Sequence, residues 1–234
     1  MLISVHMPKT GGLSFRAMLE EHFGGRFAHD YGDYPLAHSP EVRRQMALTA
    51  SPEPDSEQLE NIDCVHGHFL PVKYQPLASQ RDCTFVTWLR EPVTRLVSHY
   101  LYWQRTYDPQ SAGTSVLHKR VMEEGWSLED FCLAPELRNI YTQFLWSFPL
   151  QDFDFIGITE YFDEDFRYFC TAFLGNNLQP RRINQRDEES PVAGLDAAIV
   201  KRISDYHAED VALYLEALRM REGRVGAGMR AAGS

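Results

Sequence analysis

Lys9 stands just before a pair of glycines, in the run Pro8-Lys9-Thr10-Gly11-Gly12 near the start of the chain. Its ammonium group supplies a positive charge, and the glycines allow a tight turn in which backbone amides can closely approach a ligand. Where such a loop leads into a helix, the free N–H groups and the helix dipole point at the same spot. These residues therefore predict a cradle for a phosphate or sulfate group.

Two histidines separated by one glycine, His66 and His68, are the second candidate for chemistry. A histidine titrates near neutral pH and can act as a general base. The competing interpretation is a pair of hydrogen-bonded scaffold residues at the end of a strand. We expect no metal site here, because the sequence offers no third ligand at a convincing spacing.

Arg90 and Ser98, on either side of Pro92 in the sequence, are the third candidate for chemistry. The planar guanidinium group of an arginine can bind two oxygens of a phosphate at once. Because proline suits the first position of a helix, Arg90 should stand at a strand-to-helix junction. The alternative is that Arg90 is a surface charge at a helix end and Ser98 an ordinary helix residue. An anion cradle at Lys9 makes that alternative the weaker one.

The order of residues in the Lys9 loop distinguishes two kinds of phosphate-binding loop. A nucleoside-triphosphate loop reads G-x-x-x-x-G-K-[ST], with the lysine after the last glycine, whereas Lys9 precedes both glycines. The run His6-x-Pro8-Lys9-Thr10-Gly11-Gly12-x-Ser14 instead resembles the 5′-phosphosulfate loop of the sulfotransferases. It is most similar to the carbohydrate branch that includes the heparan-sulfate O-sulfotransferases.

Two further stretches carry the same resemblance. The run from Leu89 to Tyr100 looks like the 3′-phosphate-binding element of the family, and His66-Gly67-His68 resembles the catalytic element of the 2-O-sulfotransferases. The resemblance implies the donor 3′-phosphoadenosine-5′-phosphosulfate (PAPS), the product PAP, no metal, and an acceptor with a free hydroxyl on a carbohydrate or small metabolite. His68 would be the catalytic base, His66 its neighbour, and Lys9 would stabilise charge on the transferred group.

The resemblance also implies a set of donor-binding residues. Lys9 and its loop would bind the 5′ side, Arg90 and Ser98 the 3′-phosphate, and a basic loop at residues 180–186 would close over the nucleotide. The full set is Lys9, Thr10, Gly11, Gly12, Leu13, Ser14, Arg90, Ser98, Arg181, Arg182 and Arg186.

The elements that must position these residues follow from the hydrophobic pattern. Short apolar runs predict strands at residues 2–5, 62–65, 84–89 and 153–159. Helical spacing predicts helices that start at Ser14, as a capping residue, and that cover 42–50, 92–101, 116–122, 128–133, 137–146, 160–173 and 195–220. The alternation predicts a three-layer α/β/α fold with a central parallel sheet, which the resemblance makes the P-loop-like sulfotransferase fold. Open sheets of this kind bind ligands at the carboxyl ends of their strands.

Composition and charge indicate the number of domains, the classes of partner and the location to expect. We expect residues 1–222 to form a single sulfotransferase domain and the Gly- and Ala-rich residues 223–234 to be a disordered tail. The formal net charge of −10 argues against nucleic-acid and anionic-membrane partners. Four scattered cysteines, no apolar run of membrane-spanning length and no recognisable signal peptide favour a cytoplasmic protein. The oligomeric state is left open.

Two other functions compete with sulfuryl transfer. A kinase-like phosphotransferase would need Mg²⁺ ligands and the Gly-Lys-Ser/Thr order, and the sequence has neither. A catalytically silent nucleotide-binding module would not need both Lys9 and His68.

Overall fold

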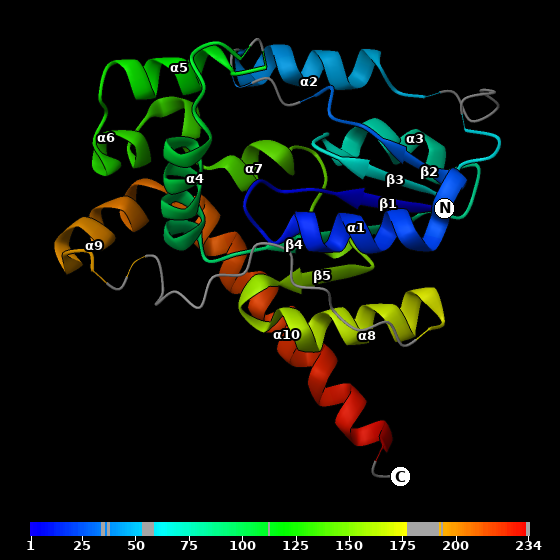
Figure 1. Cartoon of the computed structure of the whole chain (residues 1–234). Helices are drawn as coiled ribbons and strands as arrows, with labels where there is room; N and C mark the ends of the chain where they lie inside the picture. The colour runs from blue at the N-terminus through cyan, green and yellow to red at the C-terminus, as the bar shows by residue number, and fades with distance from the viewer. Residues whose placement is uncertain are drawn as a thin grey trace.

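Five parallel strands form the central sheet of the computed structural model, which describes residues 1–33, 36, 38–52, 59–111, 113–176, 192 and 194–232. The strand order is β2-β3-β1-β4-β5 (Figure 1). The strands are β1 (Leu2–Val5), β2 (Phe27–His29), β3 (Cys64–Gly67), β4 (Thr84–Leu89) and β5 (Phe155–Ile158). All of the paired strands run parallel, as the alternation of strands and helices predicts.

Helices connect the strands and cover both faces of the sheet (Figure 1). They are α1 (Gly12–Phe23), α2 (Pro40–Thr49), α3 (Gln75–Ala78), α4 (Pro92–Thr106), α5 (Val116–Glu123), α6 (Leu128–Cys132), α7 (Ile140–Phe144), α8 (Phe162–Leu174), α9 (Ala197–Tyr206) and α10 (Ala208–Ala232). The three-layer α/β/α prediction is therefore confirmed. None of the helices in the described ranges is both long and apolar enough to span a membrane.

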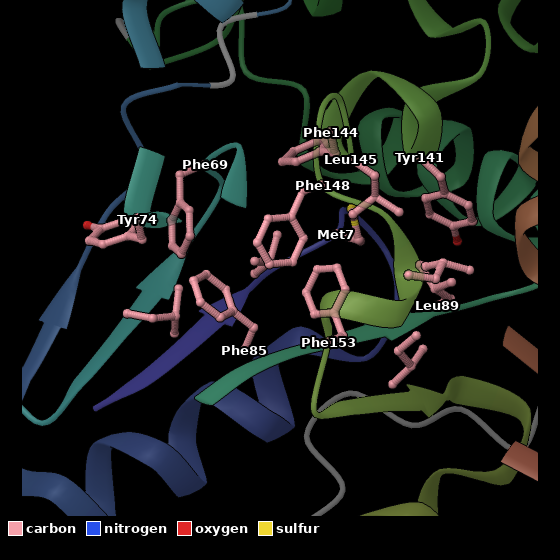
Figure 2. Packing of buried hydrophobic residues seen from close by; sticks show 14 of the residues in the cluster. Met7, Phe69, Tyr74, Phe85, Leu89, Tyr141, Phe144, Leu145, Phe148 and Phe153 are labelled. Carbon is pink, nitrogen blue, oxygen red and sulfur yellow. The ribbon is translucent and has the colours of Figure 1, made fainter. Parts of the chain in front are cut away.

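Alternate strand residues divide the core between the two faces of the sheet. Ile3 and Leu89 pack with α7 and α10 on one face, whereas Val86 and Trp88 pack with α1 and α8 on the other. Figure 2 shows the first face, where aromatic side chains of the sheet and of the α7 region meet. Because each fully buried large apolar side chain contributes about 1.5–3 kcal/mol, these two layers hold the strand ends in fixed positions.

The strand predicted at residues 62–65 is shifted in the structure. β3 covers Cys64–Gly67, so His66 lies inside the strand and not after its end. The polar His66 ring can lie in a buried strand because it forms a hydrogen bond, with 2.8 Å between its Nδ1 and Ser4 Oγ on β1. β2 was not predicted, because three residues at the sheet edge give too short a pattern.

The single helix predicted at residues 195–220 is two helices, α9 and α10, with a break at His207. The His207 ring is buried, where Nε2 donates to Cys132 O at 2.7 Å and Nδ1 accepts from Asn139 N at 3.2 Å. These contacts to distant parts of the chain explain why the apolar periodicity alone was misleading.

α10 continues to Ala232, through most of the residues for which the sequence predicts a disordered tail. Arg221 Nε and a terminal nitrogen of Arg224 each lie 2.9 Å from Asp165 Oδ1 on α8, and Arg224 also donates to Ile156 O on β5. These contacts bind the helix to the sheet at the start of the expected tail. That residues 1–222 form one domain stays a prediction.

Candidate active site

The loops that follow β1, β3 and β4 leave the sheet from one edge. In the parallel register, Val5 of β1 pairs with Gly67 of β3 and Thr87 of β4. The Lys9 loop, His68 and Arg90 follow these strand ends closely in sequence. The structure therefore gathers the three groups singled out by the sequence at the carboxyl edge of the sheet.

The Lys9 loop has a backbone suited to an anion. Lys9 (φ 67°) and Gly11 (φ 84°) both adopt the left-handed conformation, which a lysine rarely takes and which marks functional loops. The loop is held by Thr10 Oγ1, which donates to Met7 O, and by Thr159 Oγ1, which donates to Thr10 O, both at 2.9 Å. Gly11 is the N-cap of α1, so the expected cap Ser14 instead lies in the first turn. A cap residue with no side chain leaves that helix end accessible to a ligand.

Lys9 itself lies in positively charged surroundings. Its Nζ is 3.9 Å from the centroid of the Tyr102 ring on α4. Burial lowers the pKa of Lys9 to about 8, helped by the charges of Arg105 and Arg90. Among the described residues no carboxylate pairs with this ammonium group. A locally basic site in a protein with net charge −10 indicates an anionic ligand.

The backbone of Arg90 is held by two hydrogen bonds to the side chain of Tyr141. Its N–H donates to Tyr141 Oη at 3.0 Å, and the Tyr141 hydroxyl donates to Arg90 O at 2.7 Å. Its guanidinium group reaches Lys9 O at 3.4 Å. Tyr141 is positioned in turn by Asp210 of α10, which accepts from the backbone N–H groups of Tyr141 and Thr142 at 3.1 Å and so caps α7.

Ser98 and Tyr102 lie four residues apart on α4, and therefore on one face of that helix. Because Tyr102 contacts Lys9, this face borders the Lys9 loop. Ser98 is half-buried there. Arg105 lies three residues beyond Tyr102, and its effect on the pKa of Lys9 places its charge near the loop.

His68 has the hydrogen bond that a general base requires. Its Nδ1 lies against the backbone oxygen of His6, and because a carbonyl can only accept, Nδ1 must carry the proton. The lone pair of the neutral ring is therefore on Nε2. Burial lowers the pKa of His68, so that the ring is neutral at pH 7. The ring of Tyr31 stands edge-on to His68 with 4.9 Å between centroids.

His66 is placed differently from His68. Its side chain is only 1% exposed, one ring nitrogen bonds Ser4 Oγ, and burial lowers its pKa to about 3. A ring so enclosed on an inner strand supports its neighbours but has little access to a substrate. Of the two histidines, His68 is the less buried and the one whose tautomer is fixed by a backbone oxygen.

Arg181, Arg182 and Arg186 are outside the described residues. In the described part of the chain, no group of three or more His, Cys, Asp or Glu side chains could hold a metal ion. Cys64, Cys132 and Cys170 are buried free thiols, and Cys83 is a half-buried one.

Sequence reasoning did not identify Tyr31, Tyr102, Arg105 or Tyr141. Tyr102 could have been found from its helical spacing to Ser98. Tyr141 could not, because its partner Arg90 lies 51 positions away in the chain.

Comparisons with known proteins give weak similarities. No protein-family model matches the chain, and no curated protein matches it. A sulfotransferase from Alicyclobacillus acidocaldarius aligns with a TM-score of 0.46 and 18% identity, over 93% of this chain and 94% of that one. Mouse sulfotransferase SULT7A1 complexed with PAP aligns with a TM-score of 0.47 and 14% identity, over 92% of this chain and 88% of that one. Similarity at this level does not establish a family.

Proposed function

We propose that this protein is a sulfotransferase that moves a sulfuryl group from PAPS to an acceptor hydroxyl, with His68 as general base. One observation carries the proposal: the basic Lys9 loop follows β1, the central strand, and is flanked by His68 after β3 and Arg90 after β4. A donor anion, a transferred group and a base can therefore meet at one edge of the sheet.

The residues present fit an anionic donor. PAPS supplies a sulfuryl group attached to a phosphate leaving group, together with a 3′-phosphate. The amides of Gly11 to Ser14 at the start of α1 would bind the 5′ side, and Lys9 would balance charge that develops during transfer. Arg90 and Ser98 would hold the 3′-phosphate, and Arg181, Arg182 and Arg186 remain proposed ligands from the sequence. No protein-bound metal is needed by this scheme.

His68 would take the proton from the acceptor hydroxyl through Nε2. The hydrogen bond from Nδ1 to His6 O keeps the ring in the tautomer that this step requires. Because burial lowers the pKa of His68, the ring can accept a proton at neutral pH. The hydroxyl would attack in line with the leaving phosphate, in a geometry set by the two loops.

The acceptor is proposed to be a carbohydrate or a small hydroxylated metabolite. The His66-Gly67-His68 element favours the carbohydrate, 2-O-sulfotransferase-like branch. Tyr31, which is 40% exposed beside His68, offers a ring face to such an acceptor. A cytoplasmic location and the absence of nucleic-acid or membrane partners complete the proposal.

Titration of the purified protein with PAP, and with ATP plus Mg²⁺, tests the donor. We expect PAP to bind much more tightly than ATP. Arg90→Ala should weaken PAP by about 2–3 kcal/mol, roughly 30- to 150-fold in Kd, because a hydrogen bond to a charged group is lost. Arg167→Ala, which removes an exposed arginine of α8, is the control for loss of a positive charge and should leave the Kd unchanged.

Each rival function gives a different result. Tight binding of Mg²⁺-ATP with weak PAP would indicate the phosphotransferase. Tight PAP binding without transfer from labelled PAPS to glycans, phenols or small metabolites would favour the silent binding module. Equal PAP affinity in the wild type and Arg90→Ala would remove Arg90 from the site.

A further inference from the structure

His6 lies between the Lys9 loop and His68, and the proposed reaction gives its side chain no role. We propose that His6 is a positioning residue, whose ring holds His68 in its reactive orientation and fixes the distance between that base and the donor loop. This inference rests on the proposed function and concerns the same site.

The first part of the argument is the contact between His6 and His68. The two rings are stacked, with 4.4 Å between centroids and 28° between planes. The backbone oxygen of His6 also receives the Nδ1 proton of His68. One residue therefore sets both the tautomer of His68 through its backbone and the plane of that ring through its side chain.

The second part is the contact between His6 and the donor loop. A Cβ atom built on Gly12 would lie only 1.7 Å from His6 Nε2. The His6 ring therefore rests directly on the backbone of the first residue of α1, whose amides are proposed to bind the donor. Only glycine leaves room for the ring, which explains the second glycine of the Gly11-Gly12 pair without reference to a ligand.

The third part is the anchoring of His6 on its other side. Its ring stacks on His66 with 4.9 Å between centroids, and His66 is fixed by Ser4. The backbone N–H of His6 donates to Gly67 O at 2.8 Å. Among the described residues, His6 Nδ1 has no hydrogen-bond partner. Stacking on His66 and His68 therefore holds the ring on two sides, as expected of a spacer.

His6 also stays uncharged in this position. Burial lowers its pKa well below the ordinary value, and His68, His66, Arg16 and Lys9 add to the effect. The ring is therefore neutral at pH 7 in the free protein, and the effect proposed for it is geometric.

The test compares His6→Ala with His118→Ala. His118 is a matched control on α5: it is buried, stacks on Trp103 at 4.6 Å, and bonds a backbone oxygen, but lies outside the site. His6→Ala should lower kcat about 10–100-fold, since a displacement of about 1 Å at a reacting group can cost about 10²-fold. PAP affinity should change little. His6→Asn, which keeps a planar group in part of the space, should fall between the wild type and His6→Ala.

A second measurement does not depend on activity. Imidazole ¹⁵N spectra of the wild type should show His68 protonated at Nδ1 only. In His6→Ala the backbone oxygen of residue 6 remains, but without the stacked ring His68 can turn away from that oxygen, so a mixture of tautomers should appear. His118→Ala should give no such mixture. If the protein proves not to be a sulfotransferase, this spectrum still tests the positioning. An unchanged His68 tautomer together with unchanged kcat in His6→Ala would overturn the inference.

The contact with Gly12 gives the last check. Gly12→Ala should displace the His6 ring and weaken both PAP binding and stability. In the double variant His6→Ala/Gly12→Ala the new methyl group has space, so stability should recover relative to Gly12→Ala alone. Additive losses in the double variant would show that the ring does not act as the spacer.

Discussion

Replacing Lys9 by methionine should stabilise the protein while it removes activity. The ammonium group has a pKa of about 8 in the folded protein against an ordinary value of 10.5. Each unit of pKa corresponds to about 1.4 kcal/mol, so charging Lys9 costs the fold about 3 kcal/mol at pH 7. The contact with the Tyr102 ring returns about 0.5–2 kcal/mol of this. Lys9→Met should therefore raise the free energy of unfolding by about 1–3 kcal/mol.

The pH dependence of this gain has a definite sign. Below pH 8 both folded and unfolded chains carry the charge, and the wild type bears the full cost. Between pH 8 and about 10.5 the unfolded chain binds more protons than the folded one, so the stability of the wild type rises with pH. The difference between Lys9→Met and the wild type should close over this range. Methionine has an unbranched side chain similar to the aliphatic part of lysine, and the backbone conformation at residue 9 is the same in both proteins. The difference in free energy of unfolding therefore reports the charge.

Urea unfolding of both proteins at pH 7 and pH 10.5, without ligand, measures the effect. Lys119→Met, at a lysine of similar exposure on α5, is the control and should change stability little at either pH. Turnover of Lys9→Met should fall about 10²–10³-fold, with a much smaller loss of PAP affinity, because PAP lacks the sulfuryl group. If Lys9→Met is no more stable than the wild type at pH 7, the view of Lys9 as a strained functional charge is wrong.

Two further predictions concern the proposed base His68 and the hydrogen bonds by which Tyr141 holds Arg90. His68→Ala should lower turnover about 10²–10⁴-fold with PAP affinity nearly unchanged. His66→Ala should mainly lower the free energy of unfolding, and a larger loss of turnover in His66→Ala than in His68→Ala would identify His66 as the base. Because the pKa of His68 lies below its ordinary value of 6.5, lowering the pH should leave turnover level near pH 7 and reduce it only on further acidification. A loss of turnover on acidification that already begins above pH 7 would contradict the assignment. Tyr141→Phe should lower the free energy of unfolding by about 1–3 kcal/mol, since the buried N–H of Arg90 loses its acceptor, and should weaken PAP binding measured by calorimetry. Unchanged stability and unchanged PAP affinity would exclude a role of Tyr141 in holding Arg90.

The parts of the fold that the sequence predicts are those set by local signals. β1 and β4 have the expected bounds because each is an apolar run that ends where the chain must turn. α4 begins at Pro92 because proline fits the first helical position, and Glu91 caps the helix by accepting from the N–H groups of Val93 and Thr94. Arg90 at the junction follows from these two neighbours.

The parts that the sequence does not predict depend on contacts between distant residues. β2 exists because its backbone pairs with β3, and its three residues carry no pattern of their own. His66 can lie inside a strand because Ser4, 62 positions away, bonds its ring. The placement of Lys9 against Tyr102 and of His6 over Gly12 likewise requires the assembled sheet. The sequence therefore supplies the candidate groups of the site, but not the neighbours that hold them.

The link from Asp210 through Tyr141 to Arg90 has a consequence for the order in which the proposed nucleotide site is assembled. Translation produces α10 after every other described element, and chains begin to fold from the N-terminus while they are being made. A nascent chain that already has β1, β4 and the Lys9 loop still lacks the carboxylate that caps α7. We therefore expect the hydrogen bonds between Tyr141 and Arg90 to be held in place only after α10 has docked. Nucleotide added to a growing chain should therefore find a complete site only after α10 has left the ribosome.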